Sequence, residues 1–204
     1  VHYLGADGTS FPTIAGSGAN GTMLHYETNR DTCEDGTLLL LDLGAKVQGY
    51  CADITRTYPV NGVFTPRQRA VYEVVLAANR AVAAAARPGV TLSGLNEICK
   101  QVLAEGCMKL GLIDSAEKIG TYYMHGVSHH LGIDVHDVSA GRDEPLKPGA
   151  VITDEPGLYI DEWEIGIRIE DDLLICEDGC EVLSADVIRE ADEIEAFMAQ
   201  AKRS

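Results

Sequence analysis

Two segments of this chain share one pattern, and that pattern limits the folds open to it. Residues 38–44 ("LLLLDLG") and 150–157 ("AVITDEPG") each end an apolar run in a carboxylate and then a glycine. Each segment is followed by a second predicted strand with its own acid, which is Asp53 in "CADITRT" and Glu170 in "GIRIEDDLLI". The repeat predicts two β-hairpins, each presenting two carboxylates, with a glycine-bearing turn inside 38–60.

Two helices are predicted between the hairpins. The first follows Thr65, a suitable N-cap with proline at the first helical position, and it ends at Pro88-Gly89. The second follows Thr91 as N-cap and ends at Gly111. The alanine-rich stretch 77–86 of the first helix favours tight helix packing.

The predicted fold class is α+β, with one domain over 1–204. A β-rich block is expected over 121–176 and a short amphipathic helix over 184–200. A helix pair precedes the second hairpin but not the first, so the duplication predicts a matching pair upstream of Val1. We therefore expect the chain to be the C-terminal part of a longer protein. A sheet face left uncovered would be apolar, which predicts a species larger than a monomer in light scattering.

Composition excludes several classes of function. The chain of 204 residues has a formal net charge of −16, and basic residues supply most nucleic-acid affinity, so no nucleic-acid partner is expected. No stretch of about 18 uncharged apolar residues exists, and no signal peptide is visible, so no membrane partner is expected. The six cysteines form no Cys-x-x-Cys pair and indicate free thiols in a reducing cytoplasm, with a disulfide or thiolate metal site as the alternative.

The acids of the hairpins indicate cation binding. A charged side chain inside an apolar strand is costly unless it is paired or bound to a metal. Only Arg56 and Arg168 lie near these acids in the sequence as cationic partners. The alternative is that the acids lie at strand ends and face solvent. The four acids are Asp42, Asp53, Glu155 and Glu170.

Four of the six histidines lie within residues 125–136, "HGVSHHLGIDVH". In an extended segment His125 and His129 share a face, and His130 points the other way. One imidazole together with four carboxylates suits two divalent ions such as Mn²⁺, Co²⁺ or Zn²⁺ rather than an all-oxygen Ca²⁺ site. Two such ions can share a bridging hydroxide and polarise a carbonyl group.

The chain resembles the pita-bread metallopeptidases, in particular the aminopeptidase P and prolidase branch. Five motifs carry the resemblance in the family's order: "GSGANGTMLHY" (16–26), "LLDLGAKVQGYCADITRTYPVNG" (40–62), "HGVSHHLGIDVHD" (125–137), "EPGLYI" (155–160) and "GIRIEDD" (166–172). The likeness implies a pita-bread fold, a pseudo-twofold repeat of a helix pair plus antiparallel sheet, with the first helix pair missing here. The family's additional N-terminal domain, which helps form its pocket wall and subunit contacts, is also missing.

The resemblance implies a role for each candidate residue. Asp53 and Glu170 would bridge two ions, Asp42 would serve one ion, and His129 and Glu155 would serve the other. Glu155 would also handle the proton of the reacting water. Three histidines would line the substrate pocket. His25 and His136 would bond the scissile carbonyl or its oxyanion, and His125 would lie on the proline side. Arg168 would orient the metal-binding carboxylates.

The implied activity is hydrolysis of the peptide bond between an N-terminal residue and a following proline. A hydroxide that bridges the two ions would attack the scissile carbonyl. The resemblance implies Mn²⁺, and the ligand set also admits Co²⁺, Zn²⁺ or Fe²⁺. The implied substrate is a peptide with proline second, and the full-length protein is expected to be a homo-oligomer. Three alternatives stay open: an Xaa-Pro dipeptidase (prolidase), a non-catalytic binding module on this fold, and a metal-free enzyme like creatinase. A methionine aminopeptidase fits "SHHLGIDVHD" and "GIRIEDD" poorly.

Overall fold

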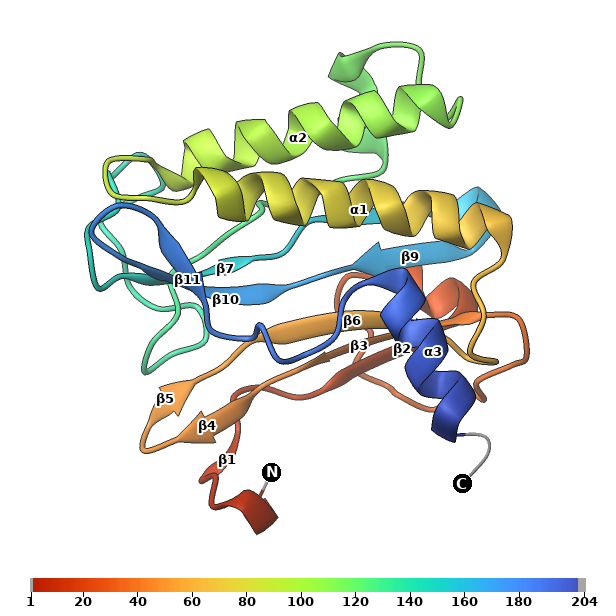
Figure 1. Cartoon of the computed structure of the whole chain (residues 1–204), viewed down its shortest axis with the longest axis horizontal. Coiled ribbons are helices and arrows are strands. Elements are labelled where there is room, and N and C mark those ends of the chain that lie inside the picture. Colours follow the sequence, from red (N-terminus) through yellow and green to blue (C-terminus); the bar gives the residue numbers. More distant parts are fainter. Residues whose placement is uncertain (1, 202–204) are drawn as a thin grey trace.

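Two half-sheets lie against each other beneath a pair of helices (Figure 1). The structure is a computed structural model that describes residues 2–201. The first half contains β1 Gly8–Thr9, β2 Ile14–Ser17, β3 Leu38–Leu43, β4 Ala45–Val47, β5 Tyr50–Cys51 and β6 Ile54–Pro59. The second half contains β7 Val151–Asp154, β8 Gly157–Ile160, β9 Ile165–Arg168, β10 Asp171–Ile175 and β11 Cys180–Val182. The helices are α1 Pro66–Ala85, α2 Leu92–Lys109 and α3 Ala191–Ala201, with 3₁₀ turns at His2–Leu4, Gly18–Thr22, Ala116–Thr121 and Asp161–Trp163.

The first predicted hairpin is confirmed. Strand β3 pairs antiparallel with β6, so that Asp42 lies opposite Thr55. The hairpin continues through β4 and β5 to a turn where Gln48 and Gly49 both have positive φ, 51° and 85°. This left-handed conformation is easiest for glycine and explains the turn signal in the sequence.

The second hairpin repeats this plan. Strand β7 pairs with β10, and β8 pairs with β9 beyond it. Glu155 falls in the break between β7 and β8, and Glu170 falls in the break between β9 and β10. The two acids of this hairpin therefore lie at interruptions of the strand pairing, one in each arm, and both line the same cavity.

The two half-sheets meet along a seam between β6 and the arm formed by β9 and β10. The backbone N–H of Glu170 donates to the carbonyl of Thr55 at 3.0 Å. The hydroxyl of Thr57 donates to the carbonyl of Arg168 at 3.0 Å and accepts from its N–H at 3.2 Å. Thr55 and Thr57 therefore link the two half-sheets, and the seam brings the acid-bearing ends of both hairpins together.

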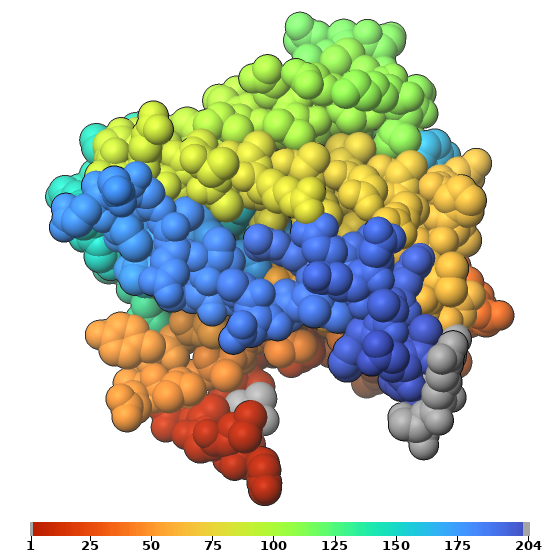
Figure 2. Space-filling model, in the orientation of Figure 1, coloured from red at the N-terminus to blue at the C-terminus, as the bar shows by residue number. Residues whose placement is uncertain are grey.

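The helix pair covers the outer face of the second half-sheet. Helix α1 starts at a capping box in which the side chains of Thr65 and Gln68 each bond the other's backbone N–H, as the sequence predicted for its start. Helices α1 and α2 approach closely at Gly106, where an added Cβ would lie 2.3 Å from a methyl carbon of Val74. Figure 2 shows the two helices as a continuous layer on this face of the molecule.

The first half-sheet has no comparable layer among the described residues. Alternate residues of β3 are buried toward the centre, namely Leu38, Leu40 and Asp42. The residues between them are only half-buried, and Leu43 is 42% exposed. Helix α3 lies beside part of this half (Figure 1), but it does not form a pair like α1 and α2.

Two predicted segments differ from the structure. The block 121–176 is β-structured only from 151 onward, because the glycine-rich stretch before it runs as a loop with one bridge, between His130 and Ile152. The tail helix begins at Ala191 rather than 184, because residues 183–187 form turns and the residues after them are held by tertiary hydrogen bonds. The carbonyls of Val187 and Ile188 accept from Arg56 and are unavailable to a helix.

The six cysteine thiols are free, as the sequence predicted. Within residues 2–201, no helix is long and apolar enough to cross a bilayer.

Candidate metal centre

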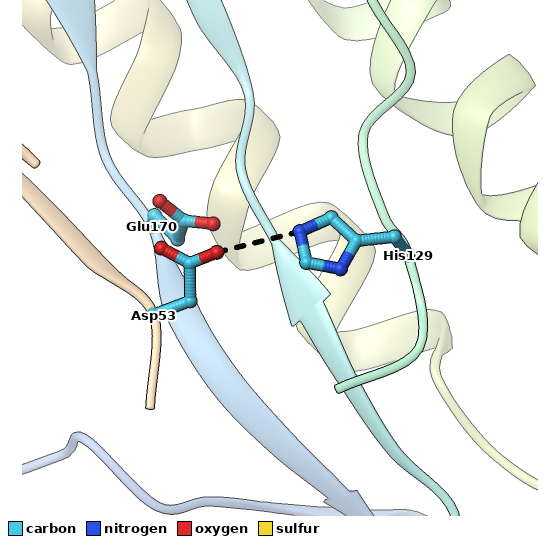
Figure 3. A group of neighbouring side chains, drawn as sticks. All are labelled: Asp53, His129 and Glu170. Carbon is cyan, nitrogen blue, oxygen red and sulfur yellow. Dashed lines mark ion pairs between the residues drawn. The ribbon is translucent and has the colours of Figure 1, made fainter. Parts of the chain in front are cut away.

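Three metal-binding donors from distant parts of the chain converge at the seam. One donor atom each of Asp53, His129 and Glu170 can be chosen so that all lie within 4.8 Å of one another. Figure 3 shows both carboxylates directed toward the imidazole edge. Nε2 of His129 lies 3.4 Å from Oδ2 of Asp53 and 3.6 Å from Oε1 of Glu155. The loop around His129 thus faces acids from both hairpins.

The imidazole of His129 has a fixed orientation. Its Nδ1 lies 3.0 Å from the carbonyl oxygen of His130, and only a protonated nitrogen can pair with a carbonyl. Nε2 of the neutral ring therefore offers its lone pair toward Asp53 and Glu155. This is the usual arrangement of a metal-binding histidine, in which the second nitrogen donates to a backbone carbonyl.

A buried hydrogen-bond network centred on Arg168 holds the carboxylates of Asp42 and Glu170. Arg168, only 3% exposed, donates from Nη2 to Asp42 at 2.6 Å and from Nε to the hydroxyl of Thr55 at 3.1 Å. The Thr55 hydroxyl donates in turn to Glu170 at 2.6 Å. Arg168 also donates from Nη1 to the hydroxyl of Tyr159 at 2.9 Å, so one guanidinium orients acids of both hairpins.

His125 has both ring nitrogens engaged within the protein. Nδ1 lies 2.9 Å from the carbonyl oxygen of Gly126, and Nε2 accepts from the hydroxyl of Tyr159 at 2.8 Å. The ring packs edge-on against Tyr123 and Tyr159. Burial lowers the pKa of His125 to about 4, so the imidazole is neutral near pH 7. Its exposed ring surface presents an apolar contact rather than a free hydrogen-bonding atom.

The electrostatics of the centre call for a cation. Burial, with Asp53 and Asp42 nearby, raises the pKa of Glu155 to about 7, although His129 and Arg168 oppose the shift. Burial and three neighbouring acids raise the pKa of Glu170 well above its ordinary value. Burial also raises the pKa of Asp42 against the effect of Arg168. One arginine does not neutralise this many carboxylates.

The donor set fits a divalent cation. Oδ1 of Asp42 is buried and has no hydrogen-bond partner within the described part of the chain, and such atoms carry a large desolvation cost. One imidazole nitrogen and several carboxylate oxygens are the ligands that Mn²⁺, Fe²⁺, Co²⁺ and Zn²⁺ accept. The residues that would hold the metal are Asp42, Asp53, His129, Glu155 and Glu170.

A cavity of about 230 Å³ opens onto these donors. All five line it, together with His25, His125, His136 and Arg168. His136 packs edge-on against the imidazole of His129, with ring centroids 4.4 Å apart. An adjoining cavity of about 290 Å³ shares His25, His136, Asp42 and Asp53 and adds apolar walls. His130 lies outside both linings, as its expected orientation implied.

Sequence reasoning missed several residues of the site. Thr55 and Tyr159 complete the network around Arg168, and Arg142 lines the cavity with its Nη2 3.2 Å from the carbonyl of Ser128. Asp172 accepts from the backbone N–H of Asp53 at 3.2 Å. Thr55 and Tyr159 lie inside motifs that the sequence singled out, but only the tertiary contacts identify what they bond.

Comparisons with known proteins agree with this geometry. The sequence matches metallopeptidase family M24 over residues 1–177. It is 43% identical to the Xaa-Pro aminopeptidase of Escherichia coli K12 over 98% of this chain and 49% of that protein. It is 40% identical to Xaa-Pro aminopeptidase 2 of Streptomyces coelicolor over 97% of this chain and 47% of that protein.

The fold agrees with a solved structure of the same kind. Aminopeptidase P from E. coli with the inhibitor Pro-Leu superposes with a TM-score of 0.96 at 41% identity, over all of this chain and 50% of that one. The fold is therefore the pita-bread fold expected from the motifs. The chain spans about half the length of the curated relatives it matches. On these matches and on the geometry above, the chain belongs to metallopeptidase family M24.

Proposed function

We propose that this chain carries the active site of an Xaa-Pro aminopeptidase, which hydrolyses the bond between an N-terminal residue and a following proline. The observation that carries the proposal is the convergence of five candidate metal ligands, from both hairpins and the histidine loop, on one cavity. Relatives that carry the name Xaa-Pro aminopeptidase support it.

Two divalent ions, with Mn²⁺ as our choice, would supply hydroxide near neutral pH and polarise the scissile carbonyl. Asp53 and Glu170 come one from each hairpin and lie in one donor group with His129, and they are proposed as shared ligands. Asp42 is proposed for one ion, and His129 with Glu155 for the other. The ligand chemistry also admits Co²⁺, Zn²⁺ and Fe²⁺.

Glu155 is the proposed proton acceptor and donor. Its side chain is 18% exposed and lies beside His125 and His129, whereas Glu170 is only 2% exposed. Its pKa of about 7 in the metal-free protein reflects burial among other acids. A carboxylate with this environment can hold a proton from water and pass it to the leaving proline nitrogen.

The histidines are proposed to place the substrate. His25 and His136 lie where the two cavities join and would donate to the carbonyl oxygen as negative charge develops. The ring of His125, with Tyr123 behind it, offers an apolar surface suited to the proline ring. The N-terminal residue would then occupy the adjoining cavity, whose walls include Phe11 and Ile14.

The biological setting follows as a proposal. The partner is a peptide with proline second, since solved relatives are described with substrate and with Pro-Leu. Free thiols favour a reducing compartment such as the cytoplasm. The half-exposed face of β3 favours a homo-oligomer in the full-length protein.

The test uses metal-stripped protein and two peptides, Xaa-Pro and Xaa-Pro-Yaa, before and after addition of Mn²⁺. Cleavage of the tripeptide only with metal is the expected result. Cleavage of the dipeptide alone would assign a prolidase instead. Bound metal without cleavage of either peptide would contradict activity of this chain by itself, and neither metal nor cleavage would favour a binding module.

A further inference from the structure

Arg56 lies close to the candidate metal centre but does not line its cavity, and its side chain is held entirely by hydrogen bonds within the protein. It is 3% exposed and donates five hydrogen bonds, which is the full capacity of a guanidinium. Nη1 donates to two carbonyl oxygens, at 2.9 Å to Thr55 and at 2.6 Å to Glu170. These two residues face each other across the seam, where the N–H of Glu170 also donates to the carbonyl of Thr55.

The rest of the guanidinium is anchored on the far side. Nη2 donates to Oδ1 of Asp171 at 2.7 Å, and this carboxylate is fully buried. Nη2 and Nε donate to the carbonyls of Val187 and Ile188, at 3.0 and 3.1 Å. The planar fork therefore contacts three segments at once: β6, the break between β9 and β10 that carries Glu170, and the stretch before α3.

We propose that Arg56 is a positioning residue for the metal centre, which sets the separation of Asp53 and Glu170 by locking the seam from behind. Arg56 lies three residues beyond Asp53 and bonds the backbone of Glu170, so it connects the two acids proposed as shared ligands. The inference rests on the proposed function only in requiring that a divalent ion binds there. A lysine keeps the charge beside Asp171 but has no rigid fork, so it cannot hold both carbonyls in this geometry.

The test is Mn²⁺ titration by calorimetry of wild type, Arg56→Lys and the control Arg189→Lys. Arg189 also pairs with Asp171, through the other oxygen, but no hydrogen bond from its side chain to Glu170 or Thr55 is present in the described structure. We expect Arg56→Lys to weaken Mn²⁺ binding about 10- to 100-fold, the range found when groups that orient metal ligands are removed. Arg189→Lys is expected to change the affinity less than threefold, even where both variants lower the melting temperature by similar amounts.

An affinity of folded Arg56→Lys within about twofold of wild type would overturn the inference and leave the proposed function standing. A wild-type chain that binds no Mn²⁺ would overturn both. Should Arg56→Lys not fold, amide exchange in the metal-free wild type decides. A seam locked by Arg56 keeps the Glu170 amide protected without metal, and free exchange there would overturn the proposal.

Discussion

The two halves of the molecule each carry two candidate metal-binding acids, but only the second half lies beneath a helix pair. The hairpin of β3 and β6 carries Asp42 and Asp53, and the hairpin of β7 and β10 carries Glu155 and Glu170. The second half lies beneath α1 and α2, and its core side chains, such as Leu173, are fully buried. The outer face of the first half is only half-buried. The difference leaves the shared seam as the feature that brings the donors of the two halves together in the described structure.

The largest expected effect tests whether activity needs an acid from each half of the molecule. We expect Asp53→Ala and Glu170→Ala each to abolish Mn²⁺-dependent hydrolysis of an Xaa-Pro-Yaa peptide, because the proposed shared ligands come one from each half. Far-ultraviolet circular dichroism should stay unchanged. Glu181→Ala, an exposed acid in β11, is the control and should keep full activity. Retained activity in either active-site variant would remove the two-metal interpretation.

Core truncations measure the unequal support directly. Leu173→Ala in β10 removes a side chain with no exposed surface and should lower the free energy of unfolding by about 2 to 5 kcal/mol. Leu41→Ala in β3 removes a half-buried side chain and should cost about 1 kcal/mol. Urea denaturation at low protein concentration gives both values. Equal losses would mean that the outer face of the first half is as well packed as the second.

Proton release on metal binding should come largely from the second half. Burial raises the pKa of Glu155 to about 7, so this carboxyl holds a proton below pH 7 in the metal-free protein, and burial among other acids raises the pKa of Glu170 as well. Because the ligands must be deprotonated, Mn²⁺ affinity should rise with pH up to about 7, by about tenfold per unit for each proton displaced. Calorimetry at pH 6 in two buffers of different ionisation enthalpy counts the protons. An affinity that does not change between pH 5.5 and 7 would contradict these shifts.

The smallest expected effect concerns association through the uncovered face. We expect light scattering to report a species larger than a monomer, and Leu43→Lys in β3 to reduce its mass by placing a charge on that face. Leu183→Lys is the matched control, since Leu183 is 52% exposed and lies just after β11 in the other half. A monomeric wild type, or equal effects of the two changes, would contradict association through the first half.

The sequence predicted those features that repeat or that follow local rules. Both hairpins, the starts of α1 and α2 at Thr65 and Thr91, and the convergence of the candidate donors agree with the structure. The helix expected from 184 begins at Ala191, because hydrogen bonds to residues more than 100 positions away compete with helical ones. For the same reason, the sequence did not reveal the roles of Thr55 and Arg56 in the seam. Their partners are decided by tertiary packing, which periodicity and capping do not encode.

The seam joins residues that are far apart along the chain: 115 positions separate Thr55 from Glu170. An ion held by Asp53 and Glu170 would therefore close a loop of similar length in a chain whose thiols are all unpaired. A covalent link across a loop of about 100 residues is worth about 4.7 kcal/mol in chain entropy. The ion would act as a removable cross-link, so a chelator would both stop the reaction and remove this contribution to stability, while the hydrogen bonds of the seam keep the two halves together.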